Sequence, residues 1–417
     1  MYQIDFQHPV HIYFIGIGGI SMSGLAEILR TENFQVSGSD RAPSDLTHTL
    51  EAQGIKVLYG QKEENITPDI DLIVYTSAIR PDNPERVAAD RLHIPMLTRA
   101  QLLGQMMKNY KTPIAISGTH GKTTTTSMVS EILLENGSDP TLSIGGIYKT
   151  IGGNIRVGGS DVFVTEACEY TNSFLSFFPK IGIILNIEED HLDFFKDLQD
   201  IRSSFHKFAT LLPEDGALII NRDIDHWEEI ASGLSCRVIT YGSTAEADYS
   251  PSDITYDEFG HPTFHLMRKG GKEESFTLRV PGIHNVYNAM AAIALADLLA
   301  IDDEITRKAL LSFEGTDRRF EYKGKVNGFT IIDDYAHHPT EITATLTAAA
   351  NYPHKKLWCV FQPHTYTRTK AFLKDFAKAL CHADEIVLAD IYAAREKDTL
   401  GISSATLQQE IEKLGHK

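Results

Sequence analysis

A glycine-rich turn at residues 115–126, AISGTHGKTTTT, constrains this chain more than any other segment. An apolar, strand-length run precedes the turn and a Thr-rich helix start follows it, as in a loop that binds nucleotide phosphates. The usual loop has a Gly five residues before the Gly that precedes Lys, but Ile116 occupies that position and Gly118 lies only three residues before Gly121. We therefore expect a shortened phosphate loop in an α/β domain.

Backbone N–H groups of such a loop form a concave site for anions. Lys122 would reach the β- and γ-phosphates of a nucleotide, and the Thr123 hydroxyl would bind Mg²⁺. The alternative is an ordinary Gly-rich turn with a solvated Lys. The residues predicted to contact the phosphates are Gly118, Thr119, Gly121, Lys122, Thr123 and Thr124. For His120, inside the loop, we expect a hydrogen bond that orders it.

Composition limits the partners and the compartment. A chain of 417 residues with 39 Lys and Arg against 56 Asp and Glu carries a net charge of −17, which disfavours binding to a nucleic-acid backbone. The four cysteines form no C-x-x-C pair, as expected for reduced thiols. Neither a signal peptide nor a membrane span is predicted, so we expect a cytoplasmic protein.

Strands and helices alternate along the chain, which predicts parallel sheets covered by helices. A polar stretch near residue 110 is followed by a new strand, loop and helix, and another new start follows near residue 316. We therefore predict three tandem α/β domains, over residues 1–109, 110–315 and 316–417. The first and third are expected to be Rossmann-like, and the central one to resemble a phosphate-loop ATPase.

The first strand leads into a second Gly-rich turn, GIGGISMSG, at residues 16–24. Gly16 and Gly18 would let the backbone approach a pyrophosphate, and Asp40 ends the next strand, where a ribose-binding acid is expected. Ser21 replaces the third Gly of the NAD fingerprint. The turn therefore indicates a nucleotide diphosphate without a preference for NAD, and a ligand-free turn is the alternative.

Acidic residues follow two strands of the central unit, as a Mg²⁺ site requires. Glu166 ends one strand, and Glu189, Asp190 and His191 follow the next. Because His usually binds softer metals, His191 is either a metal ligand or a hydrogen-bonded loop residue. Glu169 is interpreted as a solvated acid or as an acid outside the ligand shell.

Further polar residues gather at helix starts and at a domain junction. Asn285 and Asn288 lie three residues apart, hence on one face of an apolar helix, although one of them could be only an N-cap. Arg319 lies where an arginine could meet a γ-phosphate on domain closure, or it belongs to an exposed linker. Asp334, His337, His364 and Arg368 follow strands of the third unit, where open α/β sheets bind ligands.

Taken together, these segments resemble the Mur ligases, the ATP-dependent amide-forming enzymes of peptidoglycan synthesis. The resemblance covers essentially the whole chain, and its shortened phosphate loop accounts for Ile116. The motifs that carry it are GIGGISMSG, GTHGKTTTT, TEACEY, NIEEDHLD, GIHNVYNAMAA, GTDRRFEY, DDYAHHPTE and FQPHTYTRT. The family continues into further sheet beyond residues 403–417, so a shortened C-terminal domain is expected.

The resemblance implies roles for these residues. Lys122, Glu166, His191 and Arg319 would be catalytic, and Thr123, Glu166 and His191 would bind magnesium. Asn285, Asn288, Arg319 and Asp334 would join the phosphate loop in binding ATP. Gly16, Gly18, Asp40 and Ser77 would bind the UDP-sugar, and His337, His364 and Arg368 the incoming amino acid.

The members most similar to this chain join L-alanine to the lactyl carboxylate of UDP-N-acetylmuramate through an acyl phosphate. We therefore expect UDP-N-acetylmuramate and L-alanine as substrates, in a monomer or homodimer. The nearest alternative is a ligase that recycles a murein tripeptide onto the same UDP-sugar. A dehydrogenase would leave Lys122, Glu166 and His191 unexplained, and a non-catalytic nucleotide-binding regulator is the remaining alternative.

Overall fold

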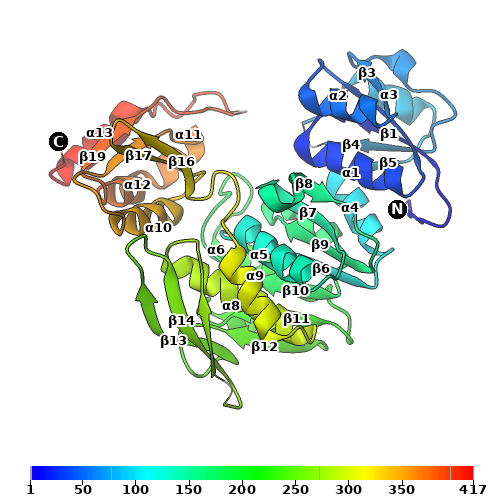
Figure 1. The fold of residues 1–417 in the computed structure, drawn as a ribbon. Coiled ribbons are helices and arrows are strands. Elements are labelled where there is room, and N and C mark those ends of the chain that lie inside the picture. Colours follow the sequence, from blue (N-terminus) through cyan, green and yellow to red (C-terminus); the bar gives the residue numbers. More distant parts are fainter. Residues whose placement is uncertain (1, 77, 272, 395, 417) are drawn as a thin grey trace.

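The computed structural model of the chain describes residues 2–76, 78–271, 273–394 and 396–416. It contains three units in chain order, each built from strands and helices (Figure 1). The first unit has a five-stranded sheet, the second a ten-stranded sheet, and the third two small two-stranded sheets. The predicted α/β class is confirmed.

The N-terminal sheet has the order β3-β2-β1-β4-β5, and every neighbouring pair is parallel. Its two central strands, β1 and β4, are apolar and largely buried, as in other parallel sheets that helices cover on both faces. The elements are β1 (His11–Ile15), α1 (Ile20–Thr31), β2 (Gln35–Asp40), α2 (Asp45–Ala52), β3 (Lys56–Tyr59), η1 (Glu63–Asn65), β4 (Leu72–Tyr75), α3 (Pro84–Arg91), β5 (Met96–Thr98) and α4 (Arg99–Met107).

The central sheet has the order β15-β14-β13-β12-β11-β10-β6-β9-β7-β8, with a parallel middle and antiparallel edges. Its first elements are β6 (Thr112–Ser117), α5 (Lys122–Glu135), β7 (Thr141–Tyr148), η2 (Lys149–Ile151), β8 (Gly153–Arg156), β9 (Val162–Ala167), η3 (Tyr170–Ser176), β10 (Ile181–Ile184) and α6 (Leu198–Ala209). The rest are β11 (Ala217–Asn221), α7 (Trp227–Ala231), β12 (Arg237–Tyr241), β13 (Tyr249–Tyr256), β14 (Pro262–Arg268), β15 (Glu273–Thr277), α8 (Ile283–Leu298) and α9 (Asp303–Ser312).

Helix α8 forms the middle of the central core. Its Ala-rich stretch, residues 289–296, is buried, and α8 lies against α5 and the strands of the sheet. The helix is apolar over nearly its whole circumference, as expected for a buried helix. Its small side chains let neighbouring backbones approach closely. This packing fixes the start of α8 beside the start of α5, where the predicted nucleotide-binding residues are found.

The C-terminal unit begins with a hairpin. Two antiparallel strands follow residue 316, and the helical stretch over residues 368–380 is divided at Phe372. The elements are β16 (Glu321–Val326), β17 (Phe329–Asp333), α10 (Pro339–Ala350), β18 (Trp358–Phe361), α11 (Tyr366–Ala371), α12 (Leu373–Leu380), β19 (Glu385–Leu388) and α13 (Ser404–Lys413).

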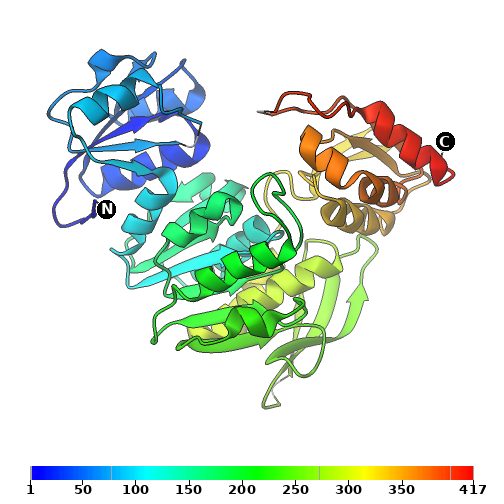
Figure 2. The same ribbon diagram turned by 180° about the vertical axis from the view of Figure 1, so that it is seen from behind.

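The N-terminal and C-terminal units both adjoin the central unit. The N-terminal and C-terminal units lie at opposite ends of the same side of the central unit, as the two views show (Figures 1 and 2). In the described part of the chain, no helix has the length and apolar character needed to cross a membrane.

Candidate active site

The phosphate loop joins the carboxyl end of β6 to the start of α5, which confirms the predicted strand, loop and helix. Gly118 and Gly121 have positive φ angles of 145° and 82°, which residues with a Cβ rarely adopt. A Cβ on Gly121 would also lie 2.6 Å from Oδ1 of Asn288. Backbone conformation and close packing against α8 therefore both require glycine at position 121.

We predict that Gly121→Ala lowers the free energy of unfolding more than Gly137→Ala does. Gly137 also has a positive φ, of 71°, but a Cβ there would meet no atom within 4 Å. The control variant should cost about 1–2 kcal/mol for the left-handed backbone alone, and Gly121→Ala should exceed it because of the contact with Asn288. Equal losses in urea denaturation would contradict the packing argument.

Lys122 is the first residue of α5, and its ammonium group is largely buried. It donates to the carbonyl oxygens of Gly118 and Thr119 and pairs with Glu169, with 3.1 Å between Nζ and Oε2. Burial opposes its charge, but the carboxylates of Glu169 and Glu166 outweigh burial and raise the pKa of Lys122. Glu169 is 3% exposed, so its interpretation as a solvated acid was wrong.

Glu166 and Thr123 lie next to each other beside Lys122. The Thr123 hydroxyl donates to Oε2 of Glu166 at 3.2 Å, and the N–H of Gly145 donates to Oε1. Burial raises the pKa of Glu166, although Gly145 and the charge of Lys122 oppose the shift. A hydroxyl and a carboxylate are the hard oxygen donors that Mg²⁺ prefers, so these side chains fit the predicted metal.

His191 follows β10 and reaches the same group of residues. Its Nε2 lies 3.8 Å from Oε1 of Glu169, and its ring stacks on Tyr170 with 4.4 Å between centroids. Burial lowers the pKa of His191, which favours the neutral imidazole that a metal ligand needs. His191 therefore lies close to the Lys122–Glu169 pair.

A cavity of about 240 Å³ lies between the central and C-terminal units and borders the phosphate loop. None of the described residues of the N-terminal unit lines it. Its lining includes six residues that were predicted to bind ATP: Gly121, Thr124, Asn285, Asn288, Arg319 and Asp334. The structure thus brings together residues from the phosphate loop, α8 and the domain junction.

The two asparagines of α8 form part of this cavity and are not caps. Asn288 donates to Oδ1 of Asn285 at 3.0 Å, and Asn285 donates to the carbonyl oxygen of Pro281 at 2.8 Å. The N-cap of α8 is Gly282, which caps no backbone N–H with a side chain. The alternative that one of the two is only a cap is therefore wrong.

Arg319 and Asp334 lie on the C-terminal side of the cavity. Asp334 accepts hydrogen bonds from the N–H groups of Phe320, at 2.8 Å, and Ala336, at 2.7 Å, and burial raises its pKa. Nη1 of Arg319 lies 3.8 Å from Oε1 of Glu341. The hydrogen bond from Phe320 to Asp334 joins the segment just before β16 to the residue just after β17.

The three residues predicted near an amino acid lie around a buried ion pair that joins two units. Arg368 donates to Oδ1 of Asp190 from Nη2 at 2.9 Å and from Nε at 3.1 Å, and from Nη1 to the ring of His364. The rings of His337 and His364 are 6.0 Å apart. Although burial opposes it, the charges of His191 and Arg368 lower the pKa of Asp190 to about 2.

The predicted UDP-sugar residues lie in the N-terminal unit. The N–H of Gly18 donates to Oδ2 of Asp40 at 2.8 Å, and Gly16 has a φ of 84°. A Cβ on Gly18 would lie 2.8 Å from the Asp40 carboxylate. Gly18 and Asp40 therefore lie in contact with each other, while Ser77 lies outside the described residues.

Comparison with known families covers nearly the whole chain. The Mur ligase family, catalytic domain model matches residues 11–111, the Mur ligase middle domain model matches residues 116–296, and the Mur ligase, glutamate ligase domain model matches residues 318–417. The chain belongs to the Mur ligase family.

Curated relatives of this Mur ligase include two UDP-N-acetylmuramate–L-alanine ligases. The protein from Lachnospira eligens is 61% identical over 416 residues, which span 100% of this chain and 91% of that protein. The protein from Agathobacter rectalis is 62% identical over 404 residues, which span 97% of this chain and 88% of that protein.

Two solved structures have similar folds. The UDP-N-acetylmuramate–alanine ligase of Thermotoga maritima has a TM-score of 0.80 at 31% identity, covering 98% of this chain and 89% of that one. A murein peptide ligase from Psychrobacter arcticus has a TM-score of 0.73 at 27% identity, covering 91% of this chain and 84% of that one.

Three residues of this Mur ligase site were missed from the sequence. The Asn186 amide bonds to both backbone groups of His120, and Glu188 and Glu341 flank the His120 ring, with 3.1 Å between Nδ1 and Oε1 of Glu341. Burial would lower the pKa of His120, but these two carboxylates outweigh it and raise the pKa to about 9. The only available signal was that each acid lies beside a strand end or a helix start.

Proposed function

We propose that this Mur ligase joins L-alanine to the lactyl carboxylate of UDP-N-acetylmuramate at the expense of ATP. The convergence of the cavity, Lys122, Glu166 and His191 at one edge of the central sheet carries the proposal. The names of the Lachnospira and Agathobacter relatives support it. Residues 1–109 would bind the UDP-sugar, residues 110–315 ATP, and residues 316–417 would close over ATP and the amino acid.

In the first step, a lactyl carboxylate oxygen attacks the γ-phosphorus of ATP, and the bond to the bridging oxygen of ADP breaks. The products are an acyl phosphate and ADP. The attacking carboxylate and the triphosphate repel each other, so positive charge must be in place before attack. Lys122 supplies that charge from the loop, and Arg319 supplies it from the domain junction.

A magnesium ion would supply Lewis-acid stabilisation of the phosphate oxygens when bound. Thr123 and Glu166 would hold it through oxygen atoms, and His191 through a ring nitrogen. Glu169, which pairs with Lys122, would keep the ammonium group oriented toward the phosphates. Asp190 contributes by holding Arg368 beside the same edge of the sheet.

In the second step, the amine of L-alanine attacks the acyl carbon. The tetrahedral intermediate then expels phosphate and loses a proton to give the amide. Arg368 is suited to the alanine carboxylate because a guanidinium group binds a carboxylate through two parallel hydrogen bonds. The neighbouring rings of His337 and His364 would bound the amino-acid site on the C-terminal side.

Arg368→Lys should raise KM for L-alanine by about tenfold or more, because Lys retains the charge but loses the bidentate geometry. KM for ATP should change little, since Arg368 bonds to Asp190 and His364, beside the proposed amino-acid site. Steady-state kinetics with each substrate varied in turn would measure both constants. An increase confined to KM for ATP would contradict the assignment of Arg368 to the amino acid.

The proposed function is tested by phosphate release with ATP, Mg²⁺ and UDP-N-acetylmuramate, with either L-alanine or murein tripeptide as the acceptor. We expect release only with L-alanine. Release only with the tripeptide would identify a recycling ligase, the activity named for the Psychrobacter structure. ATP binding without turnover by either acceptor would indicate a nucleotide-binding regulator.

A further inference from the structure

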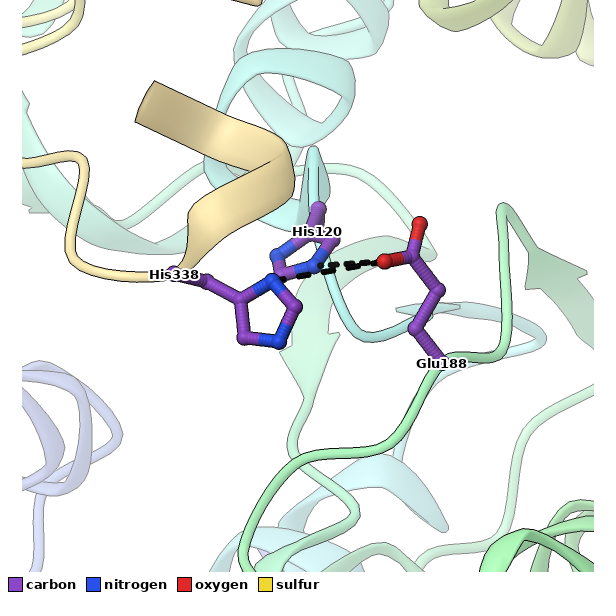
Figure 3. Close-up of side chains that lie close together, drawn as sticks. All are labelled: His120, Glu188 and His338. Carbon is purple, nitrogen blue, oxygen red and sulfur yellow. Dashed lines mark ion pairs between the residues drawn. The ribbon is translucent and has the colours of Figure 1, made fainter. Parts of the chain in front are cut away.

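A cluster of two histidines and one glutamate lies beside the nucleotide cavity, apart from the predicted magnesium ligands. His120 comes from the phosphate loop, Glu188 from the segment after β10, and His338 from the start of α10 (Figure 3). One donor atom from each residue lies within 4.8 Å of the others. Two units of the protein therefore contribute to one group of metal-ligand side chains.

One atom of this cluster makes no hydrogen bond. Nε2 of His120 is buried and has no hydrogen-bond partner in the described part of the chain. It forms an ion pair with Oε2 of Glu188 at 3.6 Å, which is too long for a hydrogen bond. A buried polar atom without a partner costs free energy, so this nitrogen is suited to a ligand.

The other nitrogen of each histidine ring is already engaged as in a metal site. Nδ1 of His120 lies 3.1 Å from the carboxylate of Glu341, and Nε2 of His338 lies 3.1 Å from the carbonyl oxygen of Glu189. Histidines that bind metals usually donate their second ring N–H to a carboxylate or a backbone carbonyl. Nε2 of His120 and Nδ1 of His338 face Glu188, and Nδ1 also accepts a long hydrogen bond from the N–H of Thr340 at 3.4 Å, which a bound cation would replace.

We propose that His120, Glu188 and His338 form a binding site for a divalent transition-metal cation of the zinc class. Two imidazole nitrogens and one carboxylate oxygen are a donor set that suits zinc better than magnesium. In a tetrahedral zinc site such donors lie about 3.3 Å apart. Here Oε2 of Glu188 is 3.6 Å from Nε2 of His120 and 4.0 Å from Nδ1 of His338, so small side-chain shifts would complete the site.

An ion at this site would join the phosphate loop to the first turn of α10. His120 and Glu188 belong to the central unit and also line the nucleotide cavity, whereas His338 belongs to the C-terminal unit. The bound cation would therefore hold the two units together beside the entrance for ATP. This role differs from that of magnesium at Thr123, Glu166 and His191, and it does not depend on which amino acid is the substrate.

The chain provides two controls. A second group, Asp253, His265 and Glu273, is also close enough to hold a cation, but it lies on the exposed edge of β13, β14 and β15, and none of these three described side chains has a buried atom without a hydrogen-bond partner. His265→Ala removes that group. His191→Ala removes the nitrogen ligand of the proposed magnesium site.

The test is titration of the protein with Zn²⁺ alone by calorimetry and with Co²⁺ alone by visible absorption, both without nucleotide. His338→Asn keeps an N-cap for α10 while removing the imidazole, and Glu188→Gln keeps the shape of the side chain while removing the charge. Circular dichroism checks that each variant is folded. Both variants should bind Zn²⁺ at least tenfold more weakly than the unaltered protein.

His265→Ala and His191→Ala should keep a site of unaltered affinity, with the Co²⁺ absorption bands of a nitrogen-liganded ion. Wild-type affinity in both His338→Asn and Glu188→Gln would overturn the proposal. So would the absence of any bound Zn²⁺ in the unaltered protein, because His120 would then act only as a cation between Glu188 and Glu341. Loss of binding in His191→Ala alone would assign the metal to the magnesium site and would also overturn it.

Discussion

Replacing Lys122 with Ala should reduce the rate of phosphate release by about 100-fold or more, the usual cost of removing one preorganised charge from a transition state. In the structure the ammonium group contacts two carbonyl oxygens of its own loop and the buried Glu169. Alanine leaves the Glu169 carboxylate buried without its cation, so charge is lost from the loop and repulsion toward ATP is added. The fall should appear in kcat as well as in kcat/KM, because negative charge builds up on the bridging oxygen of ADP as its bond to the γ-phosphorus breaks.

Lys111→Ala is the matched control. Lys111 lies just before β6, and its ion pair with Asp161 is exposed, so its removal should leave the rate within about twofold of the unaltered protein. Thermal unfolding of both variants would show whether loss of the buried partner also destabilises the fold. A Lys122→Ala protein that is folded and turns over at the unaltered rate would contradict the role of the loop.

Replacing Glu166 with Gln should lower the rate by about 100-fold at a fixed magnesium concentration, and excess magnesium should recover part of the loss. Gln keeps the size of the side chain, its one oxygen can accept from the N–H of Gly145, and its amide can donate to the Thr123 hydroxyl, so the loop geometry should survive. What is lost is the negative charge that would hold the cation. The measurement is the dependence of phosphate release on Mg²⁺ concentration.

Glu135→Gln is the control for a carboxylate of the same central unit. Glu135 pairs with Lys308 at the end of α5 opposite to the phosphate loop. Its magnesium dependence should match that of the unaltered protein. If Glu166→Gln lost activity without any change in the magnesium concentration needed for half-maximal rate, the assignment of Glu166 to the metal would fail.

Much of the fold could be predicted because its signals are local. The strand, loop and helix around Gly118 and Gly121, and the parallel strands of the first two units, follow from short apolar runs that end in polar residues. The antiparallel edge formed by β13, β14 and β15 was missed. β13 and β15 are largely exposed, so they carry little of the apolar alternation that marks a strand.

The candidate site was predicted in part for the same reason. Asn285, Asn288 and Arg319 belong to recognisable motifs, and the structure places all three at one cavity. The contact between His120 and Glu341 joins residues 221 positions apart, and no local pattern indicates it. The expected loop-ordering bond exists in the backbone of His120, through Asn186, whereas its ring reaches across to the C-terminal unit.

The burial of Glu169 also depends on tertiary structure. An acid that follows a strand is usually solvated, but the ammonium group of Lys122 and the ring of His191, which belong to other segments, both contact this enclosed carboxylate. At the break between α11 and α12, the Phe372 ring packs against His338 at the start of α10, which is again a contact between elements. Such contacts between elements decide which predicted residues meet.

The central claim is that this chain forms an acyl phosphate on UDP-N-acetylmuramate and transfers the acyl group to L-alanine. It is tested most directly with UDP-N-acetylmuramate labelled with ¹⁸O in the lactyl carboxylate, incubated with ATP, Mg²⁺ and L-alanine. Mass spectrometry should find the L-alanyl product together with phosphate that carries one labelled oxygen, since the attacking oxygen leaves with phosphorus. Unlabelled phosphate, or phosphate release without an L-alanyl product, would contradict the account.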